Sequence, residues 1–166
     1  FRRVLFRSFT IKGDTARLST IDLDVATVPG DTFALAGYAP VSMQMELLRY
    51  WRLHGRPATV PLSPQGAARI EPRGRDIVSA GGKTLPLDRF SVSGVLWGRE
   101  TLWADEAGTL VALVSVDAEF DHFEAVRRGL EDALPQFVSV AASDGMAAMA
   151  ETAAAITPPV NHVVAV

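Results

Sequence analysis

Cysteine is absent from this chain of 166 residues. Its absence excludes disulfides, thiolate metal sites and a cysteine nucleophile, but it leaves the cellular compartment open, because cytosolic and periplasmic domains alike can lack cysteine. Long apolar runs are missing too, since no segment reaches the roughly 18 residues that a membrane-spanning helix requires. Membrane insertion is therefore not expected.

An excess of charge of either sign is also missing. The chain carries 16 basic and 19 acidic residues, scattered along its length, for a formal charge of −3. This balance produces no field that would attract a phosphate backbone, so nucleic acid is not expected as a partner. Hydrophobic residues make up 48% of the chain and charged residues 21%, which is the composition of a folded globular protein.

The length corresponds to one domain with one core. We predict that a single β-rich domain spans residues 9–156. Residues 1–8 contain three arginines at the extreme end of the chain and are expected to be a non-native leader. Residues 157–166 begin with Thr-Pro-Pro and end in an apolar run, which predicts a linker and the start of a truncated following domain.

Apolar and polar residues alternate through much of the first two thirds of the chain, and turn signals recur about every 8 to 12 residues. Residues 16–28 and 32–37 predict a first hairpin, with Pro-Gly-Asp between them. A second hairpin joins residues 96–104 to 109–116, where Gly108 can supply the positive φ of a tight connection.

The segment Ser42–Leu53 also alternates and is predicted as a strand. One face of that strand, expected to be core, would carry Met43, Met45, Leu47, Arg49, Trp51 and Leu53. A helix is the competing interpretation, because Met, Glu and Leu favour helices and no breaker interrupts the segment.

After Val116 the apolar spacing changes to three or four residues, which indicates amphipathic helices over about 118–134 and 136–156. Asp117 is a plausible N-cap for the first helix, and Pro135 should kink this helix or begin the second one. The predicted fold class is therefore α+β: a mostly antiparallel sheet, as a meander, curved sheet or half-barrel, packed by a C-terminal helical segment.

The densest polar cluster lies between Asp117 and Glu124 and includes Glu119, Asp121 and His122. On a helix, Glu119 and His122 would share a face with the Glu-x-x-His spacing of di-metal bundle proteins, but such sites need two copies and two further carboxylates. Acidic residues also gather in the first turn of ordinary helices, where they complement the helix dipole. We favour that second interpretation and predict no metal site, catalytic residue or cofactor in this chain.

A second candidate surface consists of Trp97, Arg99 and Trp103, which alternate on one face of a predicted strand. Two tryptophans beside an arginine are typical of a platform that stacks on a ligand or a partner domain. The competing and favoured interpretation is a cross-strand packing ladder covered by the aliphatic stem of the arginine.

Three stretches carry a resemblance to a known family: Trp97–Trp103, Asp117–Arg127 and Asp144–Glu151. Together they resemble the N-terminal region that precedes the catalytic barrel in some bacterial amidohydrolase-superfamily proteins. The metal-binding His-x-His motif of that family belongs to the barrel, and it does not occur here.

The resemblance implies a non-catalytic accessory domain whose partner is the catalytic domain of the same polypeptide, a metal-dependent hydrolase. Because proteins of this kind are often exported, it also favours a periplasmic or secreted location. The alternative is a stand-alone β-rich module that binds an apolar ligand or lipid. That module should enclose a deep pocket, whereas the accessory domain should expose an apolar patch.

Overall fold

The computed structural model describes residues 8–12, 15–20, 23–29, 31–35, 40–63, 66–95, 98–117 and 122–155. The described chain forms ten strands, two α-helices and one 3-10 turn. In chain order these are β1 (Ser8–Lys12), β2 (Thr15–Thr20), β3 (Leu23–Pro29), β4 (Phe33–Ala34), α1 (Ser42–Leu53), β5 (Val60–Ser63), β6 (Ala67–Ala80), β7 (Lys83–Ser93), β8 (Gly98–Ala104), β9 (Leu110–Asp117), β10 (His122–Val126), η1 (Glu131–Ala133) and α2 (Leu134–Ala155).

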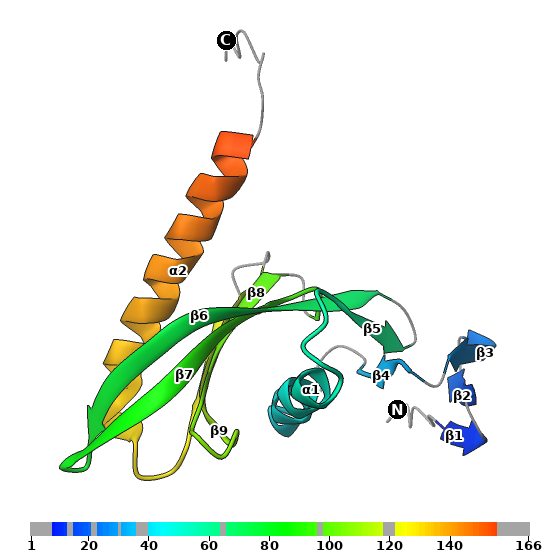
Figure 1. The fold of residues 1–166 in the computed structure, drawn as a ribbon, viewed down its shortest axis with the longest axis horizontal. Coiled ribbons are helices and arrows are strands. Elements are labelled where there is room, and N and C mark those ends of the chain that lie inside the picture. The colour runs from blue at the N-terminus through cyan, green and yellow to red at the C-terminus, as the bar shows by residue number, and fades with distance from the viewer. Residues whose placement is uncertain are drawn as a thin grey trace, which may run out of the picture.

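Seven of the strands form one curved sheet in the order β10-β9-β8-β7-β6-β5-β4. From β5 to β10 each strand pairs antiparallel with the next, and only β4 joins its neighbour in parallel. The long strands β6 and β7 arch over α1, and α2 lies across the opposite side of the sheet (Figure 1). The predicted α+β class, a curled antiparallel sheet packed by a C-terminal helix, is confirmed.

The two faces of this sheet bury separate apolar clusters. Helix α1 covers one cluster with Leu47, Leu48 and Trp51, which pack against side chains such as Phe90 and Leu102. The beginning of α2 covers the other cluster, which is made by Val78, Leu87, Trp103, Val114, Leu130 and Phe137 among others. Successive residues of a strand point to opposite faces, so β7 and β8 contribute alternate side chains to the two cores.

The segment Ser42–Leu53 is helix α1, so its prediction as a strand is wrong and the competing interpretation holds. Its buried residues are Gln44, Leu47, Leu48 and Trp51, the i, i+3, i+4, i+7 stripe of an amphipathic helix. Leu53, which the strand would have placed in the core, is 84% exposed. Leu47 and Trp51 are four residues apart, which fits both the two-residue period of a strand and the 3.6-residue period of a helix, so the alternation was misleading here.

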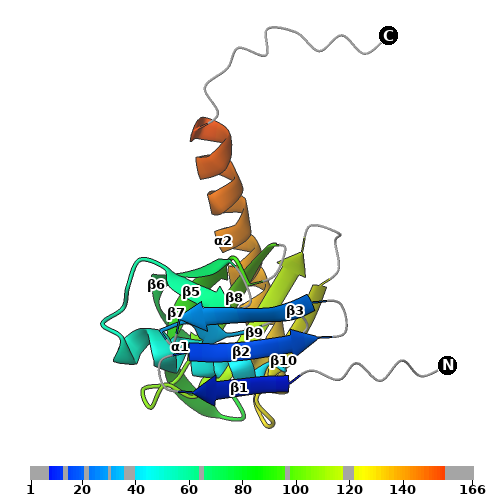
Figure 2. The same ribbon diagram turned by 90° about the vertical axis from the view of Figure 1, so that its right-hand side faces the viewer.

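The predicted first hairpin between residues 16–28 and 32–37 is also wrong. Strands β2 and β3 divide the first of these ranges and pair with each other, and with β1 they form a separate three-stranded sheet. Residues Phe33 and Ala34 form β4, which pairs in parallel with β5 instead. Strands β1, β2 and β3 run side by side in Figure 2. Strand β1 begins at Ser8, the last residue of the predicted leader; residues 1–7 and 156–166 lie outside the described residues.

The predicted helix over residues 118–134 does not form in the part that the structure describes, residues 122–134. Strand β9 continues to Asp117, which is therefore no N-cap, and β10 returns antiparallel to it from His122 to Val126. Phe123, expected on the buried stripe, is 42% exposed. The second predicted helix agrees closely with α2, in which Pro135 occupies the first turn, where its missing N–H and ring are tolerated.

The second predicted hairpin is confirmed in β8 and β9. Its connection closes with the Gly108 N–H donating to the Asp105 carbonyl at 2.8 Å, and Gly108 has the expected positive φ of 79°. Among the described helices, none is long and apolar enough to cross a membrane.

Candidate functional site

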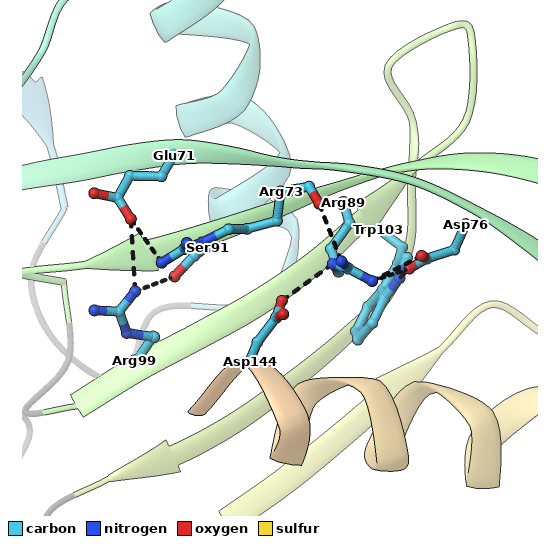
Figure 3. A network of polar contacts seen from close by, with 8 residues as sticks. All are labelled: Glu71, Arg73, Asp76, Arg89, Ser91, Arg99, Trp103 and Asp144. Carbon is cyan, nitrogen blue, oxygen red and sulfur yellow. Dashed lines mark hydrogen bonds and ion pairs between the residues drawn. The ribbon is translucent and has the colours of Figure 1, made fainter. Parts of the chain in front are cut away.

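A network of polar and charged side chains crosses the α2 face of the sheet, with Arg89 of β7 at its centre (Figure 3). One terminal nitrogen of Arg89, Nη1, lies 2.7 Å from both carboxylate oxygens of Asp76 in β6. The other, Nη2, donates to the Arg73 carbonyl at 3.0 Å. The third nitrogen, Nε, lies 3.1 Å from Oδ2 of Asp144 in α2, a charge contact without the alignment of a hydrogen bond.

Trp103 joins this network from β8. Its side chain is fully buried, its Nε1 donates to Asp76 Oδ2 at 2.8 Å, and its ring packs 4.8 Å from that of Phe137 in α2. Burying the indole while satisfying its N–H is the usual arrangement of a core tryptophan. Trp103 is therefore a packing residue beneath α2, and it presents no surface to a ligand.

Arg99 lies further along the same face of β8. Its Nη1 donates to Ser91 Oγ at 2.8 Å and lies 3.6 Å from Glu71 Oε2, which also accepts from Arg73 at 3.1 Å. Both arginines thus converge on one carboxylate in Figure 3. The side chain of Arg99 is 34% exposed, so its interactions are screened only in part.

The polar network ties α2 to the sheet at two points. Near the start of the helix, Gln136 Nε2 donates to the Ile77 carbonyl at 3.0 Å, and eight residues later Asp144 meets Arg89. At 1.5 Å per residue these contacts are about 12 Å apart along the helix axis, enough to define its direction as well as its position. We call Leu134–Asp144 the inner half of α2 and Gly145–Ala155 the outer half.

The outer half extends past the sheet (Figure 1). Met146 and Met149 are 68% and 70% exposed, and they share a helix face because they are three residues apart. The remaining residues of this half are mostly alanine, and Glu151 carries its only charge. A helix surface so poor in charge and so rich in exposed methionine is typical of a protein contact site.

A second polar pair is buried on the α1 face. Gln44 of α1, which is 3% exposed, donates through Nε2 to Oε1 of Glu100 at 3.0 Å, and Glu100 is only 1% exposed. Burial raises the pKa of Glu100 from its ordinary value near 4.5 to about 7, against the opposing effect of the Gln44 hydrogen bond.

The same pair contains two buried oxygens, Glu100 Oε2 and Gln44 Oε1, that have no hydrogen-bond partner among the described residues. A proton on Glu100 supplies the donor that the pair lacks. The sequence contained a signal for this site, because Glu100 alternates with Leu102 and Ala104 on an otherwise apolar strand face.

Two open clefts indent the described surface. One, of about 360 Å³, lies between the end of α1 and strands β6 and β7. The other, of about 260 Å³, lies between the beginning of β7 and the connection from β8 to β9. Charged side chains line both clefts, including Arg52, Arg75 and Asp88 in the first and Asp105 and Arg127 in the second.

The structure brings Arg99 and Trp103 together on one sheet face, but it does not test the rest of the candidate surfaces. Trp97, Glu119 and Asp121 lie outside the described residues. The backbone of His122 begins strand β10, so the helical Glu-x-x-His face does not form at that residue. Within the described ranges, no three His, Asp or Glu side chains are grouped as a metal site would require.

Arg89, Asp76 and Asp144 were missed by sequence reasoning, because each is an ordinary charged residue and the contacts join strands and a helix that are distant in the sequence.

Comparison with protein-family models, with curated proteins and with solved structures finds no match to this chain.

Proposed function

We propose that this chain is a non-catalytic accessory domain that packs, through the outer half of α2, against the catalytic domain of a metal-dependent amidohydrolase-like hydrolase in the same polypeptide. The observation that carries the proposal is the exposure of Met146 and Met149 on a helix that continues beyond its own sheet. A partly buried polar network fixes the direction of this helix. The helix therefore projects from the domain as a fixed element that a partner can cover.

The chemistry of the outer half favours a packed protein partner. Methionine and alanine side chains bury well against another apolar surface, and both favour the helical conformation. The resemblance of Asp144–Glu151 to the segment before an amidohydrolase barrel supports the catalytic domain of the same polypeptide as that partner. The same resemblance supports a periplasmic or secreted location.

A stand-alone module for an apolar ligand or lipid is the weaker candidate. Such a module holds its ligand in an enclosed cavity lined mainly by apolar side chains. The two clefts described above are open and lined by charged residues. Neither is the deep enclosed cavity that such a module requires.

The first experiment is to sequence the intact reading frame on both sides of this chain. The proposal predicts a downstream barrel domain containing a His-x-His motif, and a stop codon soon after Val166 would overturn it. Hydrogen exchange then compares the complete polypeptide with this chain alone. Amides between Met146 and Thr152 should exchange more slowly in the complete polypeptide, because a docked helix opens less often.

Variants locate the contact. The double substitution Met146→Asp and Met149→Asp should change the stability of this chain alone by no more than about 1 kcal/mol, because both side chains are exposed and each change costs only some helix propensity. In the complete polypeptide it should restore fast exchange in α2. The matched control is Leu53→Asp, an exposed apolar position at the end of α1, which should leave α2 protection unchanged. If this chain alone forms a dimer that the double substitution dissociates, the partner is a second copy and the proposal fails.

A further inference from the structure

The cleft between α1 and the sheet collects positive charge in a chain that is negative overall. Its lining includes the guanidinium groups of Arg52, Arg56 and Arg75, against the single carboxylate of Asp88. Arg75 donates to that carboxylate at 2.9 Å, which leaves Arg52 and Arg56 as the surplus cations. Arg89 also borders the cleft, but its guanidinium is held by Asp76 and Asp144 on the other face of the sheet.

Both surplus arginines rest on aromatic rings. The guanidinium carbon of Arg52 lies 5.3 Å from the centre of the Phe90 ring, and that of Arg56 lies 5.8 Å from the centre of the Trp51 ring. The two rings meet edge to face at 6.1 Å. A guanidinium that lies over an aromatic ring keeps its N–H groups available for a ligand. No described residue forms a hydrogen bond or an ion pair with the guanidinium group of either arginine.

Two backbone features at the end of α1 lie beside the cleft: the hydrogen bonds that end the helix and the positive φ of Arg56. Helix α1 ends with the Gly55 and Arg56 N–H groups donating to the carbonyls of Arg52 and Trp51, as in a Schellman motif. Arg56 itself has a φ of 58° and is the only non-glycine residue with a positive φ in the described part of the chain. Glycine would suit this position better, so an arginine here directs attention to its side chain.

Across the cleft, β6 contains a bulge between Pro72 and Gly74, where the pairing with β7 shifts by one residue. Bulges re-aim side chains and are frequent beside binding sites. On a third side, Gly108 lies against Arg52, since a Cβ added at Gly108 would collide with Arg52 Nη1. The guanidinium of Arg52 therefore lies between the β8–β9 connection and the Phe90 ring.

From this geometry we infer that the cleft binds a small organic acid with a flat apolar body, whose carboxylate is held by Arg52 and Arg56. An arginine fork matches a carboxylate with two parallel hydrogen bonds. The outer plane of a guanidinium that already rests on a ring offers a stacking surface to a flat ligand. The volume of about 360 Å³ is within the range of small-molecule sites.

A carboxylate fits this cleft better than a phosphate does. Asp88 lines the cleft, and Glu106 lies 3.7 Å from Arg75, so negative charge beyond one unit would be repelled. The walls also include Pro72 and the rims of Trp51 and Phe90, which suit a carbon skeleton. The inference is independent of the proposed accessory function, because the cleft lies on the face of the sheet opposite to α2.

The test titrates the whole chain with benzoate, benzyl alcohol and inorganic phosphate at low ionic strength and follows the indole N–H resonances by NMR. The Trp51 indole, which donates to the Pro57 carbonyl at 3.0 Å, borders the cleft. The Trp103 indole lies beneath α2 and is the internal reference. Benzoate should shift the Trp51 signal saturably, with little change at Trp103, and added salt should weaken the binding.

The substitutions Arg52→Gln and Arg56→Gln should each weaken benzoate binding by roughly tenfold or more, as expected for loss of a charge-assisted hydrogen bond. The matched control is Arg49→Gln on the same helix, whose side chain pairs with Glu46 away from the cleft and which should bind normally. Arg56→Gly separates binding from folding, because it relieves the positive φ and should raise the unfolding temperature while weakening binding.

Several results would overturn the inference. One is the absence of any saturable shift with benzoate at millimolar concentration. Others are equal binding of benzyl alcohol, preferential binding of phosphate, or an Arg49→Gln effect as large as that of Arg56→Gln. If Arg56→Gly raises stability without weakening the binding of benzoate, the arginine only covers the Trp51 ring and the inference fails.

Discussion

Helix α1 lies wholly on its face of the seven-stranded sheet, whereas α2 leaves its face halfway along its length. The stripe of α1 is buried, and Leu47 and Leu48 are entirely inaccessible to solvent. On α2, only Phe137 and Ala148 are buried, although the helix has 22 residues. The difference teaches that α1 is part of the core, whereas α2 is an attached arm whose inner half carries most of the attachment.

The two faces also use their polar groups differently. On the α1 face, one carboxyl and one amide are sealed within apolar packing, with the ionised form of the carboxyl disfavoured. On the α2 face, Arg89 shares partly buried charge with two aspartates, so the ionised forms compensate one another. The stability of the α1 face should therefore depend on pH. The stability of the α2 face should depend on whether Arg89 keeps both of its aspartate partners.

The largest expected effect is on the attachment of the arm. Phe137 is 1% exposed and packs on Trp103, so Phe137→Ala should lower the free energy of unfolding by about 3–5 kcal/mol. Hydrogen exchange should accelerate in α2 more than in α1, because the cavity lies under the inner half of α2. Val138→Ala, the adjacent exposed position, should change stability by no more than about 0.5 kcal/mol. Equal acceleration in both helices would show that the two faces unfold together.

The next effect concerns the α1 face and pH. The pKa of Glu100 is about 7 in the folded chain, above its ordinary value near 4.5, so the folded state binds the proton more tightly. Stability should therefore fall as pH rises from about 4.5 to about 7, by on the order of 3 kcal/mol in total from this group. Urea unfolding at a series of pH values measures this change.

The control is Glu100→Gln, which keeps the shape of the side chain and removes the titration. Other carboxyl groups contribute to both proteins, so the difference between the two pH profiles isolates Glu100. Parallel profiles for the two proteins would mean that Glu100 is not held away from water and that the α1 face is not sealed.

The sequence predicts the α+β class, the β8–β9 hairpin and α2, because each has a local signal: a turn glycine, alternating strands, or a long alanine-rich run. It fails for α1, where Leu47 and Trp51 fit both periods and the buried Gln44 hides the helical stripe. It fails for β10, because pairing with β9 outweighs a local spacing of three and four.

The candidate site was predictable only in part. Trp103 and Arg99 stand out in the sequence as residues of one strand face, but their partners do not. Asp76 lies in β6 and Asp144 in α2, and no local pattern indicates that both meet Arg89. Contacts between elements distant in the sequence follow from how the sheet curves, and short-range periodicity carries no information on that.

The smallest expected effect is the most specific for α2 as an arm. Asp144→Asn removes the charge that meets Arg89 Nε at 3.1 Å while leaving the contact of Arg89 with Asp76 intact. The loss in stability should be about 1 kcal/mol, because Arg89 keeps its stronger partner. The orientation of α2 should change more than the stability, since Gln136 is then the remaining polar tether of the inner half.

Spin labels on Thr152 and on an exposed strand residue such as Ser79 would measure this orientation as a distance distribution. Asp144→Asn should broaden the distribution at nearly unchanged stability. Glu151→Gln removes one negative charge from the same helix without touching the network, so it should leave the distribution narrow. If Asp144→Asn leaves it equally narrow, apolar packing around Phe137 alone sets the direction of the arm. The polar network would then contribute to stability but not to how α2 is presented to a partner.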